Sequence, residues 1–121
     1  MADEVVTIAG QRMLACDPAG PAIATEREAT DLIGDALGAD AHVVAIPVER
    51  LGPDFFRLAS GLAAAVVQKF VNYERHLVIV GDVAAYEARS APFRDFVREA
   101  NRGRHLWFVS DRAALEEKLR G

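Results

Sequence analysis

Three short apolar runs, each preceded by a histidine, dominate the pattern of hydrophobic and polar positions along the chain. They cover residues 43–48, 77–80 and 106–109. The runs recur at intervals of roughly thirty residues, enough for one strand and one crossover helix. Each is apolar without alternation and rich in β-branched residues, as is typical of a strand buried on both faces of a parallel sheet. The pattern predicts an α/β domain built from strand–helix repeats.

Two more strands are predicted at the start of the chain. Residues 5–9 and 12–17 have a strand-like composition, and Gly10 with Gln11 between them suits a tight hairpin turn. The five segments together predict a single-domain α/β sandwich with a mixed, mainly parallel sheet of about five strands. The side chains expected on one face of the central strands are Val44, Val78 and Trp107.

Side-chain caps mark the predicted starts of three helices: Thr25, Ser90 and Asp111. Glu28, three residues after Thr25, completes a capping box, and Gly38 occupies the position of a C-terminal cap. Residues 83–89 are expected to form a loop or a short turn.

The segment 51–73 allows two interpretations. Its apolar residues follow helical spacing, which permits one long helix from Pro53. Alternatively, residues 52–59 form a loop and Ser60 caps a shorter helix that begins at Gly61, which is the interpretation we favour. The second arrangement leaves an exposed helix N-terminus, a natural anion site, beside Ser60.

Polar residues follow three of the predicted strands at the carboxyl edge of the sheet, where ligands of parallel sheets usually bind. They are Glu49 and Arg50, Gly81 and Asp82, and Ser110 and Asp111. We expect these acids and one base to meet there, in an arrangement suited to an enzyme or a small-ligand binder. The simpler interpretation, which we favour, makes them turn and cap residues.

The histidines before the strands, His42, His76 and His105, are expected at the opposite, amino edge of the sheet. Two imidazoles on adjacent strands can share a metal ion or a proton. Because no carboxylate or cysteine pattern accompanies them, we favour histidines that are merely tolerated at half-exposed strand starts.

A stripe of basic residues, Arg94, Arg98 and Arg102, recurs at four-residue spacing along one predicted helix. Such a stripe is suited to binding a phosphate group or an acidic partner. Asp95 and Glu99 flank it at neutralising spacing, however, so we favour a solvated, salt-bridged helix face.

The composition narrows the classes of function. With 121 residues, 51% of them hydrophobic and 26% charged, the chain has the profile of one soluble domain. Its net charge of −4 argues against general attraction to nucleic acid. The N-terminus is acidic and no apolar run approaches membrane-spanning length, so we expect a cytosolic protein without membrane contact. Cys16, the one cysteine, is expected to be a buried, unreactive thiol.

The charge is distributed unevenly along the chain. Residues 1–40 carry eight acids and two bases, whereas residues 89–120 carry eight bases and five acids. A molecule polarised in this way is suited to forming a homodimer or to meeting a charged protein partner. The simpler interpretation is a solvated surface.

The segments FFRLASGLAAAVVQKFVNY (55–73), LVIVGD (77–82) and RDFVREANRGRHLWFVSD (94–111) together resemble a small bacterial family. That family is catalogued as a domain of unknown function, number four-one-eight-zero. The segment TEREATDLIGDA (25–36) extends the resemblance over most of the chain. Since the family has no assigned activity, the resemblance implies no functional residues.

The order of the predicted elements is also similar to the STAS domain, the sulphate-transporter and anti-sigma-factor-antagonist module. This resemblance implies a binding protein, switched in many members by phosphorylation of a serine in an Asp-Ser-Ser/Thr-Gly-Leu loop. Here Ser60, Gly61 and Leu62 agree with that loop. Leu58 replaces its acid, and Ala59 falls where the phosphorylated serine would align, so the resemblance to the switch is partial.

The sequence therefore favours a non-enzymatic function. It has no nucleophile elbow and no glycine-rich phosphate loop, and nothing indicates a cofactor. We expect a small regulatory or protein-interaction module in which Phe55 and Phe56 supply an exposed apolar patch beside Ser60. The competing function is an enzyme or a small-ligand binder that uses the carboxyl edge of the sheet.

Overall fold

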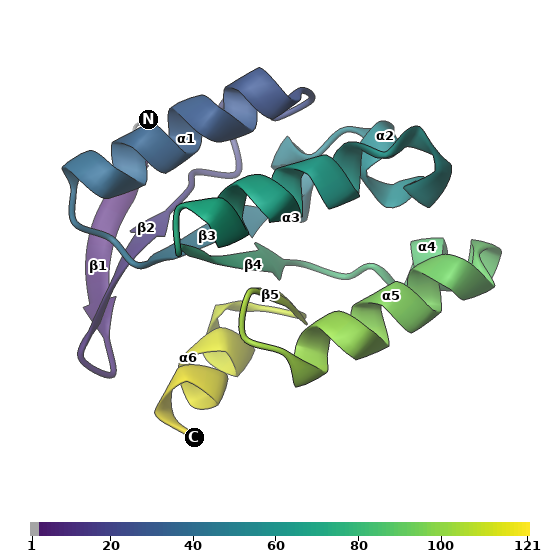
Figure 1. Cartoon of the computed structure of the whole chain (residues 1–121). Helices are drawn as coiled ribbons and strands as arrows, with labels where there is room; N and C mark the ends of the chain where they lie inside the picture. Colours follow the sequence, from purple (N-terminus) through teal and green to yellow (C-terminus); the bar gives the residue numbers. More distant parts are fainter. Residues whose placement is uncertain (1–2) are drawn as a thin grey trace.

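A five-stranded sheet with helices on both faces forms the framework of the computed structural model, which describes residues 3–121 (Figure 1). Its strands lie in sequence order: β1 (Glu4–Ile8), β2 (Gln11–Ala15), β3 (Val43–Pro47), β4 (His76–Val80) and β5 (Leu106–Val109). The β1–β2 pair is antiparallel, and each later pair is parallel. The predicted mixed, mainly parallel sheet that opens with a hairpin is confirmed.

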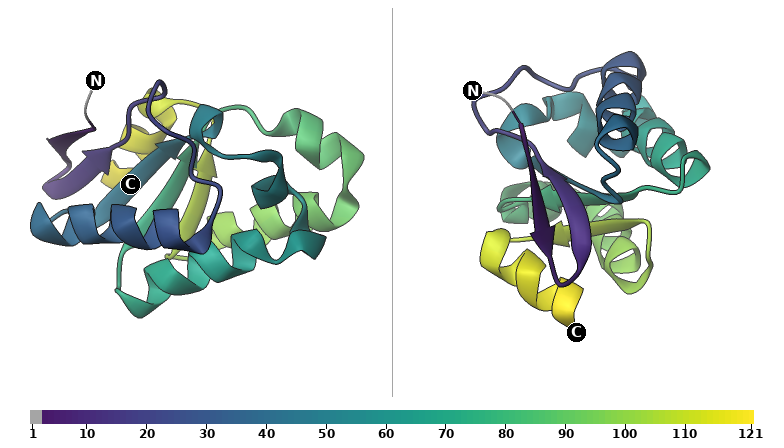
Figure 2. Two further views of the ribbon diagram at one scale, coloured as in Figure 1. Left: turned by 90° about the horizontal axis from the view of Figure 1, so that it is seen from above. Right: turned by 90° about the vertical axis from the view of Figure 1, so that its left-hand side faces the viewer.

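The helices are divided unequally between the two faces of the sheet. Three long helices fill the crossovers between parallel strands: α1 (Glu26–Gly38), α3 (Leu62–Asn72) and α5 (Ala91–Arg102). Because the strands advance in one direction and crossovers are right-handed, these helices all cover the same face. The other face is covered by α6 (Arg112–Arg120) and by the curled hairpin (Figure 2).

Each face of the sheet has its own apolar core, because alternate side chains of a strand point to opposite faces. The side chains of Val44 and Ile46 join the larger core under α1, α3 and α5. Val78 lies opposite Ala45 and Trp107 in the register, and these side chains face α6. The prediction that Val44 shares a face with Val78 and Trp107 is therefore wrong by one residue of register.

The hairpin turn lies one residue earlier than predicted. Ala9 and Gly10 both have left-handed backbone conformations, with φ of +53° and +79°. This pair of conformations matches the twist of two antiparallel strands joined by two residues. Glycine adopts it without strain, whereas an alanine there does so at some cost.

The helix caps predicted at Thr25, Ser90 and Asp111 are confirmed. The hydroxyl of Thr25 accepts a hydrogen bond from the Glu28 amide at 3.2 Å, and the Ser90 and Asp111 side chains cap α5 and α6 in the same way. Gly38, in contrast, ends α1 in helical conformation, and the left-handed residue is Asp40, with φ of +56°.

The segment between β3 and β4 agrees with neither of its two interpretations completely. It contains the 3₁₀ turn η1 (Val48–Arg50), the short helix α2 (Pro53–Phe56) and the 3₁₀ turn η2 (Leu58–Ser60) before α3 begins at Leu62. The break at Gly61, whose φ is +79°, excludes one continuous helix. The interpretation with a shorter helix after residue 60 is the nearer of the two. Its predicted cap is wrong, because Gly61 and not Ser60 is the N-cap of α3, and no side chain caps this helix.

A second short helix, α4 (Ala84–Arg89), replaces the loop or turn expected over residues 83–89. It packs beside α5, and Tyr86 stacks on Phe56 of α2 with ring centroids 4.0 Å apart. Within residues 3–121 no helix combines the length and the apolarity needed to cross a membrane.

Candidate functional site

A pocket of about 330 Å³ opens where the parallel strands end, and we call it the carboxyl-edge pocket. Small apolar residues from three neighbouring strands, Ala15, Ala45 and Val80, contribute to its wall. Glu49, Asp111 and Arg112 line it too. It therefore lies where parallel sheets usually bind ligands.

The backbone at this edge is shaped by Gly81, which follows β4. Its φ is +144°, a conformation that side-chain-bearing residues rarely adopt, and a Cβ there would approach Val48 Cγ2 to 2.5 Å. The Gly81 amide donates to the Val109 carbonyl at 2.9 Å. Glycine thus lets the chain leave β4 closely packed against η1 while the parallel pairing with β5 continues.

Two of the three acids expected at this edge share the carboxyl-edge pocket. Glu49 is exposed on η1, and Asp111 is the N-cap of α6, where its Oδ1 accepts from the Ala114 amide at 2.8 Å. Asp82 instead lines a neighbouring hollow, and its Oδ1 accepts from the Ala84 amide at 2.9 Å. Both aspartates therefore have the cap or turn role that the simpler interpretation assigned to them.

Cys16 lies at the wall of the carboxyl-edge pocket but is buried, with 6% of its surface exposed. Burial raises the pKa of its thiol to about 12, and the negative charge of Asp3 adds to the effect. A thiol in this state stays protonated near neutral pH and is a poor nucleophile. The expectation of a buried cysteine is confirmed.

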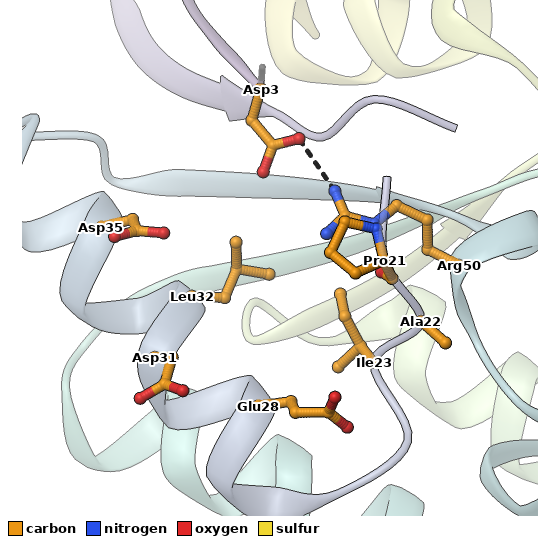
Figure 3. Close-up of a pocket in the computed structure, with 9 residues that line it drawn as sticks. All are labelled: Asp3, Pro21, Ala22, Ile23, Glu28, Asp31, Leu32, Asp35 and Arg50. Atoms are coloured by element: carbon orange, nitrogen blue, oxygen red, sulfur yellow. Dashed lines mark hydrogen bonds and ion pairs between the residues drawn. The ribbon is translucent and has the colours of Figure 1, made fainter. Parts of the chain in front are cut away.

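A second pocket, of about 410 Å³, lies between α1 and the loop that precedes it (Figure 3). Its least accessible charged side chain is Arg50, which is 5% exposed. The Arg50 Nη1 donates to Asp3 Oδ1 and its Nε to the Pro21 carbonyl, both at 2.8 Å. A Cβ at Gly20 would lie 2.8 Å from Arg50 Cζ, so the guanidinium packs directly against the glycine backbone.

Sequence reasoning named Arg50 only as a base at the carboxyl edge and missed this buried ion pair. The two partners are 47 positions apart, and no periodicity links them. Three carboxylates of α1 line the same pocket: Glu28, Asp31 and Asp35. Through its ion pair with Asp3, Arg50 connects the start of β1 to the end of η1.

The three histidines line one pocket of about 400 Å³ at the amino edge of the sheet, which we call the amino-edge pocket. Its lining includes His42, Glu74, Arg75, His76, Arg104 and His105. Within residues 3–121 no group of three histidine, cysteine or acidic side chains is arranged to hold a metal ion. A metal ion shared by two of the imidazoles, the alternative from the sequence, stays a prediction.

The arginine stripe lies on the solvent-facing side of α5. Arg94 and Arg98 are exposed, and Arg102 approaches Glu99 at 3.7 Å. The interpretation of a solvated helix face agrees with this exposure.

Ser60 is exposed at the end of η2. Its hydroxyl donates to the Asp54 carbonyl at 2.6 Å and accepts from the Leu62 amide at 3.2 Å. Phe55 and Phe56, in contrast, are 1% and 5% exposed. Both rings belong to the core, so the expected apolar contact patch beside Ser60 is wrong.

A groove of about 460 Å³ nevertheless lies between α2, η2 and α4, and we call it the α2–α4 groove. Pro53, Leu58 and Pro92 contribute apolar surface, and Arg57 and Arg89 contribute charge. Sequence reasoning missed this groove because one of its walls, at Tyr86 and Arg89, belongs to α4, which was not predicted.

Comparison with known proteins identifies a family and no individual relative. No curated protein and no solved structure matches the chain. The similarity to the STAS domain stays a prediction. The model of the family described as a domain of unknown function (DUF4180) matches residues 8–119. Because this match spans nearly the whole chain, the protein belongs to the DUF4180 family.

Proposed function

We propose that the protein binds a small molecule with a cationic group in the carboxyl-edge pocket. The observation that carries this proposal is the meeting of Glu49 and Asp111 over small apolar residues from three neighbouring strands. The volume of the carboxyl-edge pocket, about 330 Å³, falls at the lower end of the range for ligand pockets. Arg112 is the one base in the lining, and it is paired with Glu116 at 3.8 Å. The negative charges of Glu49 and Asp111 therefore outnumber the positive charge in the pocket.

Binding fits this pocket better than covalent catalysis does. The Cys16 thiol is protonated and buried, as described above, and Ser110 has no imidazole beside it because the histidines line the opposite edge. A nucleophile without a base is weakly reactive. The carboxylates are well suited to orienting a cation, which needs only charge and hydrogen-bond acceptors.

The test is a thermal-shift and calorimetric titration with a panel of small amines, including ethanolamine, putrescine and free amino acids. The decisive variant is Asp111→Asn, because asparagine caps a helix about as well as aspartate and removes only the charge. The matched control is Glu99→Gln on α5, outside the pocket. A ligand should raise the melting temperature of the parent and the control, and much less that of Asp111→Asn. If no amine binds, or if Asp111→Asn binds as the parent does, the proposal fails.

A second candidate function is the regulatory or protein-interaction module, and the α2–α4 groove favours it. The groove combines apolar surface with the charges of Arg57 and Arg89, and the exposed Ser60 directly follows Ala59 of its lining. Arg57 is paired with Asp54 at 2.8 Å, whereas Arg89 lies over the Tyr86 ring at 5.6 Å. An acidic segment of a partner protein would complement this surface.

This second function is tested by affinity capture with three forms of the protein. The parent and the control Arg94→Ala, which changes an exposed arginine away from the groove, should retain the same partner. Arg89→Ala should lose it. A partner retained equally by all three forms does not use the groove.

A further inference from the structure

The amino-edge pocket is independent of the carboxyl-edge pocket, since the two lie at opposite ends of the strands. The parallel register assembles it: His76 pairs with Val43 and Leu77 pairs with Leu106. The residues just before these strands, His42, Arg75 and His105, are therefore brought together, although each belongs to a different part of the sequence.

Arg75 stands out among the arginines of the described chain. Within residues 3–121, Arg50 and Arg75 are the two arginines that are largely withdrawn from solvent, and Arg50 is neutralised by Asp3 at 2.8 Å. Arg75 has no carboxylate within 4.0 Å among residues 3–121. Withdrawing a guanidinium from water without a counter-charge is unfavourable, so a half-buried, unpaired arginine calls for an anion.

Among the residues that the structure describes, the one side-chain partner of Arg75 is His42, which does not neutralise it. Its Nη1 lies 3.0 Å from His42 Nδ1. Because arginine can only donate, His42 Nδ1 is the acceptor in this contact, and an imidazole nitrogen brings no negative charge. The full positive charge of Arg75 therefore remains at the pocket.

Two buried nitrogens at this edge, Arg75 Nε and His76 Nε2, have no hydrogen-bond partner among residues 3–121. Such groups are rare in native proteins, and each is unfavourable until it finds a partner. The backbone carbonyls of this edge are already in use, because those of Arg12, His42 and His105 accept from the amides of His42, His76 and Leu77. The groups that lack a hydrogen-bond partner are therefore side-chain nitrogens.

The remaining charges around the pocket favour an anion. Arg104 is exposed in the lining and, within the described residues, also has no carboxylate within 4.0 Å. Glu74 is the one acid of the lining, and Asp40 stands 4.0 Å from His42 Nε2 at its border. Two arginines against one lining carboxylate leave a positive pocket on a protein whose net charge is negative.

The imidazole of His76 is fixed rather than free to turn away. It packs edge-on against Trp107 with ring centroids 4.0 Å apart. Lys118 of α6 covers the same indole, with Nζ 4.7 Å from its centroid, and adds a further positive charge behind the pocket. The pocket thus has a rigid wall on the α6 side and an exposed wall at Arg104 and His105.

We propose that the amino-edge pocket binds a phosphate-type oxyanion, either free phosphate or the phosphate group of a small organic molecule. Arg75 and Arg104 supply the counter-charge, and His105 supplies a further donor. Guanidinium groups match the geometry of phosphate oxygens with paired hydrogen bonds, and a tetrahedral anion offers acceptors in several directions at once. A flat carboxylate would satisfy fewer of the donors that converge here.

The experiment follows the imidazole signals of the protein by NMR during titration with inorganic phosphate and, separately, with glycerol 2-phosphate. Sodium chloride at matched ionic strength is the control for screening. The variants are Arg104→Ala, an exposed change that is expected to keep the fold, and the matched control Arg98→Ala on α5. We expect saturable shifts of the His42 and His105 signals in the parent and in Arg98→Ala. The apparent dissociation constant should be about tenfold weaker in Arg104→Ala.

The two probes separate the two sources of phosphate. Binding of both probes assigns the site to a phosphate group carried by an organic molecule, and binding of inorganic phosphate alone assigns it to the free ion. The proposal is overturned if neither probe saturates, if chloride produces the same shifts, or if Arg104→Ala binds as tightly as the parent. None of these outcomes depends on amine binding at the carboxyl edge, so the two proposals fail or stand separately.

Discussion

The buried pair between Arg50 and Asp3 should contribute a large share of the stability of the fold. Its Nη1–Oδ1 distance is 2.8 Å, and the side chains of Arg50 and Asp3 are 5% and 21% exposed. Changing Asp3→Ala would leave the Arg50 guanidinium buried with the Pro21 carbonyl as its remaining acceptor. It would also remove the Asp3 oxygen that accepts from the Asp17 amide at 2.8 Å.

The size of the effect follows from burial. Removing one partner of a fully buried ion pair costs about 3–5 kcal/mol. Because a fifth of the Asp3 side chain still meets water, we expect a loss at or below the lower end of that range, about 2–3 kcal/mol. In a domain of this size such a loss lowers the melting temperature by roughly 10 °C.

The chain offers a control with the same geometry and a different environment. Arg57 and Asp54 are also 2.8 Å apart, but their side chains are 69% and 58% exposed. We expect Asp54→Ala to lower the free energy of unfolding by less than about 1 kcal/mol, as is usual for exposed pairs. Urea unfolding at pH 7, followed by circular dichroism, gives both values if the m-value is unchanged. Equal losses in the two variants would refute the argument that burial makes the Arg50–Asp3 pair important.

Three further predictions concern the sheet, the arginine stripe and pH. Val78→Asp places an unpaired carboxylate at a side chain that is 0% exposed and should cost several kcal/mol, roughly the whole stability margin, so a parent-like melting curve would refute the central position of β4. Arg94→Ala and Arg98→Ala should each change the free energy of unfolding by less than about 0.5 kcal/mol in urea titrations, and a loss near 2 kcal/mol would contradict the solvated face. Burial, with smaller contributions from His105 and Lys118, lowers the pKa of His76 from 6.5 to about 4. The folded state therefore binds fewer protons than the unfolded state, and stability present above pH 6.5 is lost as the pH falls toward 4. After allowance for partial exposure we expect a loss of about 1–2 kcal/mol, measured as urea midpoints from pH 7 to 4.5 and absent in His76→Gln.

The strands and long helices could be predicted because their residues carry local patterns. The continuous apolar runs at 43–48, 77–80 and 106–109 correspond to β3, β4 and β5 within one residue at each end, since burial on both faces leaves no alternation. The same lack of alternation is why the face occupied by Val44 could not be predicted. A strand that is apolar on both sides contains no information about which side faces which helix.

Residues that depend on distant partners were beyond the reach of local patterns. Phe55 and Phe56 look like an exposed pair beside a loop, but the stacking of Phe56 on Tyr86 and the position of α4 bury them. The Arg50–Asp3 pair joins segments that only the folded sheet brings together. At the carboxyl edge, Glu49 and Asp111 share one pocket and Asp82 lines the neighbouring hollow. The order of strand ends could not predict this division, because the chain at Gly81 packs closely against Val48.

The covering of one face of the sheet by α6 has a consequence during protein synthesis. The second core, which contains Met13, Val43, Val78 and Val109, is completed by Leu115 of α6, which is 0% exposed. This helix leaves the ribosome after every strand, so the nascent sheet presents an apolar face until residues 112–120 emerge. A chaperone that shields apolar surface would act in that interval, and a chain that stalls near residue 110 would be left with a surface prone to aggregation.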